Sequence, residues 1–172
     1  MERTAFEPLA IVDVQYSESG ANAACVVGEH WAADTAIEQR QVCSPDVEPY
    51  VPGEFYRREM PPILGVLSAV TTPFEVIVVD SYVVLDEHGT PGLGARLYEH
   101  FEQRYAVIGV AKTAYRGSSF AVPVSRGTSR RLLYVTALGI SQELAAERVS
   151  QMHGNYRVPT LIRLADQLAR GR

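Results

Sequence analysis

The stretch EVIVVDSY, residues 75–82, is an almost continuous apolar run with one acidic residue inside it, Asp80. A run this short and this apolar is typical of a β-strand that is covered on both faces. A helix-like segment at residues 93–103 and a second buried run, AVIGVAK at residues 106–112, follow it. Strand, helix and strand in this order form a βαβ unit, which predicts that the two strands pair in parallel.

Upstream of this unit, three strand-like segments follow one another with short links. They are LAIVDVQY at residues 9–16, NAACVVG at residues 22–28 and TAIEQRQVC at residues 35–43. The third alternates polar and apolar residues, as a half-exposed edge strand does. Consecutive strands with short links predict an antiparallel meander.

Helices are predicted between and after these strands. Beyond the proline-rich loop SPDVEPYVP, residues 44–52, apolar residues recur at helical spacing through about residue 69, and Pro61 and Pro62 are expected in the first turn of that helix. A strand near residues 132–136 and two amphipathic helices close the chain. The order βββ-α-β-α-β-(β)-αα predicts an α/β fold: a ribonuclease-H-like mixed sheet, with a three-strand antiparallel meander plus parallel strands, and helices on both faces.

Length and composition indicate one domain, residues 1–172, because 47% of the residues are apolar and can fill one core. No apolar run approaches the roughly 20 residues that cross a bilayer, and no signal peptide pattern is present, so we expect a cytoplasmic protein without membrane contact. Cys25 and Cys43 are expected to be small buried side chains in a reducing compartment.

The formal net charge of −4 is not the strongly basic balance of a protein that holds nucleic acid by bulk electrostatics. A local basic surface is still compatible with this total. Arginines bias the last third of the chain toward positive charge, although scattered solvated arginines would look the same: Arg126, Arg130, Arg131, Arg157, Arg163, Arg170 and Arg172.

Three acidic residues, Asp13, Glu59 and Asp80, interrupt apolar surroundings where an unpaired charge is costly. If the first and fourth strands are neighbours, Asp13 and Asp80 can face each other, and Mg²⁺ or Mn²⁺ would relieve their repulsion. Lys112 ends the second strand of the βαβ unit and would bring an ammonium group there. Carboxylates, a hard cation and a lysine suit phosphodiester hydrolysis. Alternatively, each residue is a strand-end charge in solvent or a satisfied ion pair.

Several motifs together resemble the endonuclease V family, whose members are metal-dependent nucleases that cut near deoxyinosine in DNA and inosine in RNA. The motifs are IVDVQY at residues 11–16, PYVPGEFYRREMPP at residues 49–62, VVD at residues 78–80, IGVAK at residues 108–112 and YRVPTLIRLADQLA at residues 156–169. The resemblance implies that Asp13, Glu59, Asp80 and Lys112 are catalytic. It also implies that Asp13, Asp80 and Glu59 hold the metal.

The resemblance implies a wedge loop that contacts nucleic acid at Tyr50, Val51, Pro52 and Gly53. Physically, a proline-stiffened tip with a flat ring can slide between bases and support an extruded nucleotide, although an ordinary Pro-Gly turn with a surface tyrosine has the same sequence. Tyr115 is a further expected nucleic-acid contact.

The chain departs from the family pattern after Asp80, in DSYVVLDEHGTPGLG at residues 80–94. Ser81 and Val83 stand where the family has pocket glycines, so we expect side chains to protrude into an altered base pocket. Asp86 falls where the family has a histidine and is the expected additional metal ligand; His88 is the alternative. YVTALGIS, residues 134–141, lacks the Gly-His pair of the family, and the family's N-terminal helix is expected to be missing.

These observations predict a Mg²⁺- or Mn²⁺-dependent endonuclease that acts on nucleic acid, DNA or RNA. The resemblance adds inosine sites as candidate targets, while the altered base pocket leaves the preferred base open. Two alternatives remain open from the sequence. One is a non-catalytic descendant that binds nucleic acid or protein, and the other is a metal-dependent hydrolase of a small phosphorylated molecule. The sequence leaves the oligomeric state open.

Overall fold

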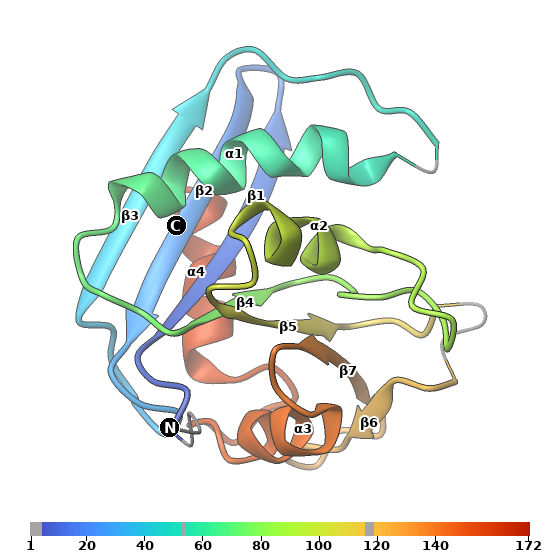
Figure 1. Ribbon diagram of the computed structural model, residues 1–172. Helices are drawn as coiled ribbons and strands as arrows, with labels where there is room; N and C mark the ends of the chain where they lie inside the picture. The colour runs from blue at the N-terminus through green and yellow to red at the C-terminus, as the bar shows by residue number, and fades with distance from the viewer. Residues whose placement is uncertain (1–4, 53, 116–118) are drawn as a thin grey trace.

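The structure is a computed structural model that describes residues 5–52, 54–115 and 119–172. Its centre is one mixed sheet with the strand order β3-β2-β1-β4-β5-β7-β6. The strands are β1 (Leu9–Ser17), β2 (Gly20–Gly28), β3 (Glu38–Ser44), β4 (Val76–Val79), β5 (Ala106–Ala111), β6 (Val122–Val124) and β7 (Leu133–Leu138) (Figure 1).

The strand pairing confirms the predicted meander and the βαβ unit. β1 pairs antiparallel with β2, and β2 with β3, while β1, β4 and β5 run parallel to one another. β7 pairs antiparallel with β5 and with β6. β6 was not predicted, because three residues with a proline among them are too few to show a periodic pattern.

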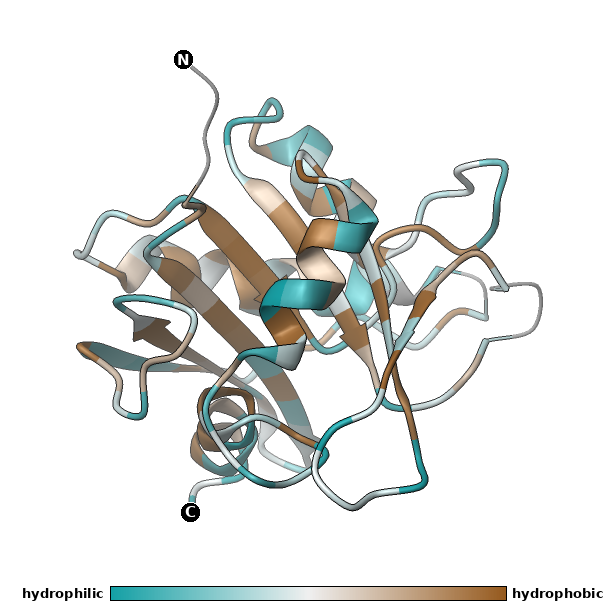
Figure 2. Ribbon diagram, turned by 90° about the horizontal axis from the view of Figure 1, so that it is seen from below, coloured by the Kyte–Doolittle hydropathy of each residue, from teal (hydrophilic) through white to brown (hydrophobic). Residues whose placement is uncertain are grey.

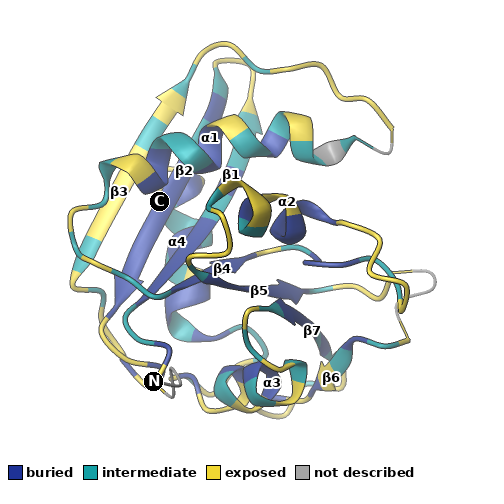
Figure 3. Ribbon diagram, in the orientation of Figure 1, coloured by how far each residue is buried: buried dark blue, intermediate teal, exposed yellow. Residues whose placement is uncertain are grey.

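Helices cover both faces of the sheet, as predicted. The helices α1 (Phe55–Ala69) and α2 (Leu93–His100) pack on one face, and α3 (Gln142–Ser150) and α4 (Thr160–Ala169) pack on the other (Figure 1). Each face contributes its own core cluster of alternating strand residues. The central strands are therefore apolar and buried, whereas β3 is largely exposed (Figures 2 and 3).

The prolines of α1 lie in the middle of the helix and not in its first turn, because the helix begins at Phe55. Pro62 has no N–H to donate to the carbonyl of Arg58, four residues earlier. The Tyr16 hydroxyl of β1 lies 3.4 Å from that carbonyl, but it donates its single proton to Glu59 at 2.5 Å. Tyr16 therefore ties α1 to the sheet through Glu59.

Two burial expectations were wrong. Cys43 is exposed, because it lies near the end of the edge strand β3, whereas Cys25 is buried as predicted; both thiols are free. Arg126 is not a surface charge, since its side chain is buried. In the part of the chain that the structure describes, no helix is long and apolar enough to span a bilayer.

Candidate active site

Asp13 and Asp80 lie side by side at the carboxyl end of the parallel pairing. The β1–β4 register ends with Val12 opposite Val79, and Asp13 and Asp80 are the residues that follow this pair. Neighbouring strands are about 4.8 Å apart. Residues two apart in a strand face the same side of the sheet. Asp13 lies two residues after Ile11, which faces α3 and α4, and Asp80 follows the same alternation at the end of β4. The two carboxylates are therefore on the same face of the sheet.

Lys112 joins them from the end of β5. Its Nζ lies 3.0 Å from Oδ2 of Asp80, in a half-buried ion pair. Tyr82 fixes the surrounding segments, because its hydroxyl donates to the carbonyl of Thr113 at 2.7 Å and accepts from the N–H of Tyr115 at 2.9 Å. The strand end that carries Lys112 is thus tied to the segment that follows Asp80.

Asp166 of α4 is a fourth acidic residue in this group, and the sequence reasoning missed it. The amide of Gln15 bridges the two aspartates, donating to Asp13 at 3.0 Å and to Asp166 at 3.3 Å. Asp166 also pairs with Arg170 one helical turn on. In sequence it is an ordinary polar residue of an amphipathic helix, and its place in the motif at residues 156–169 was the available signal.

Glu59 approaches from α1, on the opposite face, and is 8% exposed. It accepts a 2.5 Å hydrogen bond from the hydroxyl of Tyr16 on β1. The guanidinium of Arg58 lies 3.9 Å above the Tyr16 ring. Glu59 therefore sits at the sheet edge with one strong neutral donor and one nearby cation.

The pKa values of two carboxyl groups are raised because the groups are buried and lie near other carboxylates. The pKa of Asp13 is raised to about 6, chiefly by burial and further by the charges of Asp80 and Asp166. The pKa of Glu59 is raised to about 7 by burial and by the charges of Asp13 and Asp80, against the lowering effect of the Tyr16 hydrogen bond. Both ionised carboxylates would be stabilised by an additional cation.

The donor set fits a hard divalent cation, since Mg²⁺ and Mn²⁺ take oxygen ligands and carboxylates above all. Among the described residues, however, no three His, Cys, Asp or Glu side chains stand together in a ready metal-ligating arrangement. Each carboxylate is instead engaged by an internal donor: Asp13 and Asp166 by Gln15, Asp80 by Lys112 and Glu59 by Tyr16. A bound cation would replace or share these contacts.

Asp86, the expected additional metal ligand, accepts hydrogen bonds within its own loop. The Asp86 carboxylate accepts from the backbone N–H groups of His88 and Thr90, at 2.9 and 3.1 Å, and from the Thr90 hydroxyl. These bonds lower its pKa. The side chain of His88 is exposed beside Glu87. Asp86 shapes its own loop, and the strongest charge effects on Asp13 come from Asp80, Asp166 and Lys112.

Val83 does not protrude into an open pocket, contrary to the expectation. Its side chain is fully buried in the core cluster under α1 and α2. A Cβ built on Gly94 would lie 2.6 Å from a Val83 methyl, so Gly94 makes room for the valine. Ser81 is half-buried between Asp80 and Tyr82.

The expected nucleic-acid contacts lie on the surface. Tyr50 is 59% exposed, Val51 42% and Tyr115 49%, and Pro52 is exposed as well. Gly53 lies outside the described residues. The segment that contains Tyr50 leads into α1 on the side of the molecule where β4 and β5 end (Figure 1). The loop is thus connected directly to the helix that carries Glu59.

These features define a ribonuclease-H-like α/β protein with a carboxylate cluster and a lysine at the edge of its mixed sheet. A family model for endonuclease V matches residues 2–140. The chain therefore belongs to the endonuclease V family, as its motifs predicted.

Individual relatives agree with this assignment. Endonuclease V of Rippkaea orientalis is 29% identical over 154 residues, a match that covers 77% of this chain and only 66% of the relative's length. The crystal structure of endonuclease V from Streptomyces avermitilis superposes with a TM-score of 0.76 at 23% identity, over 97% of this chain and 81% of that one.

A third similar protein was solved with nucleic acid. Endonuclease V of Ciona intestinalis, in complex with a 23mer DNA that contains an inosine followed by a ribo-adenosine, has a TM-score of 0.76 at 17% identity, over 95% of this chain and 83% of that one. Likeness at this level of identity establishes a shared fold.

Proposed function

We propose that this protein is a Mg²⁺- or Mn²⁺-dependent endonuclease that hydrolyses phosphodiester bonds in nucleic acid at or near inosine. The observation that carries the proposal is the position of Asp13 and Asp80 on one face at the carboxyl ends of β1 and β4, with Asp166 joined to Asp13 through Gln15 and with Lys112 paired to Asp80. Glu59 reaches this end of the sheet from the other face. Family membership supports the reaction class, and the inosine-containing DNA bound by the Ciona intestinalis protein supports the substrate.

Asp13, Asp80 and Asp166 would hold the divalent cation, with Glu59 at its side. Such a cation lowers the pKa of a water molecule and stabilises charge on a phosphoryl oxygen. The excess of buried carboxylate charge at Asp13 and Glu59 is what fits this site to a cation. We place Asp166 in the role that the sequence had given to Asp86.

Glu59 is suited to orient and deprotonate the attacking water. Without a cation, burial and the charges of Asp13 and Asp80 raise its pKa to about 7. A cation bound beside it would lower this pKa and favour the ionised carboxylate, the form that accepts a proton from water. Tyr16 holds the carboxylate in place by its short hydrogen bond.

Lys112 would stabilise the developing charge on the scissile phosphate. Its ion pair with Asp80 keeps the ammonium at the site before substrate binds. Together with exposed arginines of the C-terminal third, Lys112 supplies the local positive charge that the overall charge of −4 conceals.

The exposed ring of Tyr50, with Val51 and Pro52, would wedge between bases and support an extruded nucleotide, and Tyr115 would contact the same strand. The two free thiols are consistent with the reducing cytoplasm that the sequence predicts.

The test is cleavage of labelled DNA and RNA oligonucleotides, with and without one inosine, by the purified protein with Mn²⁺ or Mg²⁺. We expect cleavage near inosine by the wild type and none by Asp80→Asn, while the exposed Asp46→Asn serves as matched control with wild-type activity. Wild-type protein that cuts no oligonucleotide with either metal would overturn the proposal.

A non-catalytic binding protein is the second candidate, favoured by the absence, among the described residues, of a preformed group of metal ligands. It predicts that oligonucleotide binding persists in EDTA and in an Asp13→Asn/Asp80→Asn double variant. Binding that is lost on removal of the metal would instead support the enzyme.

A further inference from the structure

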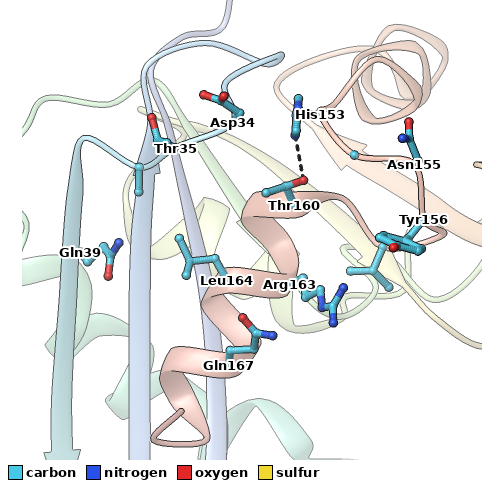
Figure 4. Close-up of a pocket in the computed structure, with 13 residues that line it drawn as sticks. Asp34, Thr35, Gln39, His153, Asn155, Tyr156, Thr160, Arg163, Leu164 and Gln167 are labelled. Atoms are coloured by element: carbon cyan, nitrogen blue, oxygen red, sulfur yellow. Dashed lines mark hydrogen bonds between the residues drawn. The ribbon is translucent and has the colours of Figure 1, made fainter.

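Two cavities lie next to each other on the α4 side of the sheet. The first, about 590 Å³, opens at the proposed active site and is lined by Lys112, Asp166, Tyr156, Arg157, Val158 and Arg163; we call it the Lys112 cavity. The second, about 530 Å³, lies between residues 34–39 and the segment 153–167; we call it the β3–α4 cavity (Figure 4). The two cavities share Tyr156, Val158 and Arg163 as a common wall.

The shared wall has the chemistry of a base-stacking platform. Tyr156 is 69% exposed, the highest value among the large hydrophobic side chains that the structure describes, and the Arg163 guanidinium lies 5.7 Å from its ring centroid. Aromatic rings and guanidinium planes are the groups on which unpaired bases stack. A nucleic-acid strand that extends from a phosphate at Lys112 would contact the Tyr156 ring before it reaches the second cavity.

The β3–α4 cavity presents groups that match the edge of a base. The amides of Gln39, Asn155 and Gln167 line it from two sides, and each can both donate and accept hydrogen bonds, as base edges do (Figure 4). The titratable side chains that face it are Asp34, His153 and Arg163. The carboxylate of Asp34 offsets the positive charge of Arg163, so the cavity is not a strongly cationic phosphate site, and its amides are the groups that distinguish it.

The wall that carries Tyr156 is held rigidly from behind. The buried Arg126 guanidinium donates to the carbonyls of Tyr156 at 2.6 Å, Met152 at 2.5 Å and Gly154 at 3.1 Å. The carbonyl of His153 accepts from the Thr160 N–H at 2.8 Å. A preformed wall loses little freedom when a ligand binds, which favours affinity.

We infer that the β3–α4 cavity is a subsite for an unpaired base of the substrate strand, next to the scissile phosphate, with Tyr156 and Arg163 as the step between the two cavities. This inference rests on the proposed nuclease function and adds to it a second point of recognition. It identifies the substrate as nucleic acid that is single-stranded on one side of the cut.

The experiment uses single-stranded DNA and RNA oligonucleotides with one inosine, shortened nucleotide by nucleotide from each end. For the wild type we expect KM to rise roughly tenfold at the step that removes the base from the subsite, as the loss of one stacked base does. Tyr156→Ala and the double variant Gln39→Ala/Gln167→Ala should lose this step and cut long and short substrates with equal KM. Tyr156→Phe should retain it, and Gln151→Ala, an exposed amide outside both cavities, is the matched control.

Three outcomes separate the possibilities. Cleavage by the wild type without dependence on length, or variants that lower kcat equally for all lengths, would overturn the subsite while the nuclease stands. If no oligonucleotide is cut, the nuclease proposal fails, and fluorescence anisotropy of the longest oligonucleotide in Ca²⁺ then decides on the subsite. Equal binding by wild type and Tyr156→Ala in that assay would overturn it too.

Discussion

The acidic residues of this protein fall into two regions that differ in how many hydrogen bonds each carboxylate accepts. Glu38, at the start of β3, accepts from the backbone N–H groups of Thr71 and Thr72, at 2.9 and 2.7 Å, and from Arg40 at 2.8 Å; Asp86 accepts three bonds within its loop. In both residues the donors lower the pKa. These carboxylates are structural, and they are satisfied without any further partner.

At the carboxyl ends of β1 and β4, in contrast, the carboxylates accept few hydrogen bonds. Asp13 and Glu59 accept fewer bonds and lie near other carboxylates, and burial together with these charges raises their pKa values to about 6 and about 7. Protein donors alone do not compensate these charges. The difference teaches that a buried carboxylate with few donors has a raised pKa and is suited to binding a cation, whereas one with many donors is held in its own part of the chain.

The largest expected effect is on catalysis. Asp13→Asn should lower the rate of oligonucleotide cleavage by more than about 100-fold, because it removes a metal-holding charge at the reacting phosphate. Glu38→Gln, from the structural region, should leave kcat unchanged. Equal losses of kcat in the two variants, measured under saturating Mn²⁺, would erase the distinction between the regions.

Asp166 and Asp86 are the two candidates for the additional metal ligand, and matched asparagine variants distinguish them. Asp166→Asn should weaken Mn²⁺ activation, seen as a rise of at least about tenfold in the Mn²⁺ concentration that gives half-maximal cleavage. Asp86→Asn should leave that concentration unchanged, because its carboxylate is engaged in its own loop. The opposite pattern would return Asp86 to the site.

The stability of the metal-free protein should fall as pH rises from 5 to 8. A carboxyl group whose folded pKa is raised stabilises the protein below its unfolded pKa, and this contribution is lost as pH passes the folded value, here about 6 for Asp13 and about 7 for Glu59. At about 1.4 kcal/mol per pKa unit, the loss from Glu59 is on the order of 3 kcal/mol.

Urea unfolding in EDTA at each pH measures this loss. Glu59→Gln should be more stable than the wild type at pH 8 and should flatten the pH profile, whereas the exposed Glu18→Gln should follow the wild type. A Glu59→Gln profile that parallels the wild type would show that burial of the ionised Glu59 is not costly.

A smaller effect is expected when the cation is restored. Mn²⁺ at about 100 times its dissociation constant should raise the free energy of unfolding by about 2.7 kcal/mol at pH 8. The gain should be smaller at pH 5, since the carboxylates must be ionised to bind metal. Mn²⁺ should not raise the free energy of unfolding of the Asp13→Asn/Asp80→Asn variant at either pH. If Mn²⁺ stabilises this variant as much as the wild type, the metal binds elsewhere.

The sequence was most informative where local pattern and chemistry coincide. The apolar run at residues 75–82, the three consecutive strands and the helical segments predicted the mixed sheet, and the charges at Asp13, Asp80 and Lys112 stood out against their apolar neighbours. The prediction of Asp86 relied on spacing along the chain, and spacing does not determine where a loop side chain points. Local donors at His88 and Thr90 determine it.

The sequence by itself determined the strand order along the chain, the parallel unit and the strand-end residues, because strand and helix periodicities and the burial of single charges are properties of short segments. Only the tertiary structure decided that α4 brings Asp166 within reach of Gln15, 151 residues away, and that Arg126 holds the wall that presents Tyr156. On an amphipathic helix or in a loop, polar residues at the surface look alike in sequence, and only the packing of the helix against the sheet shows which of them face a site.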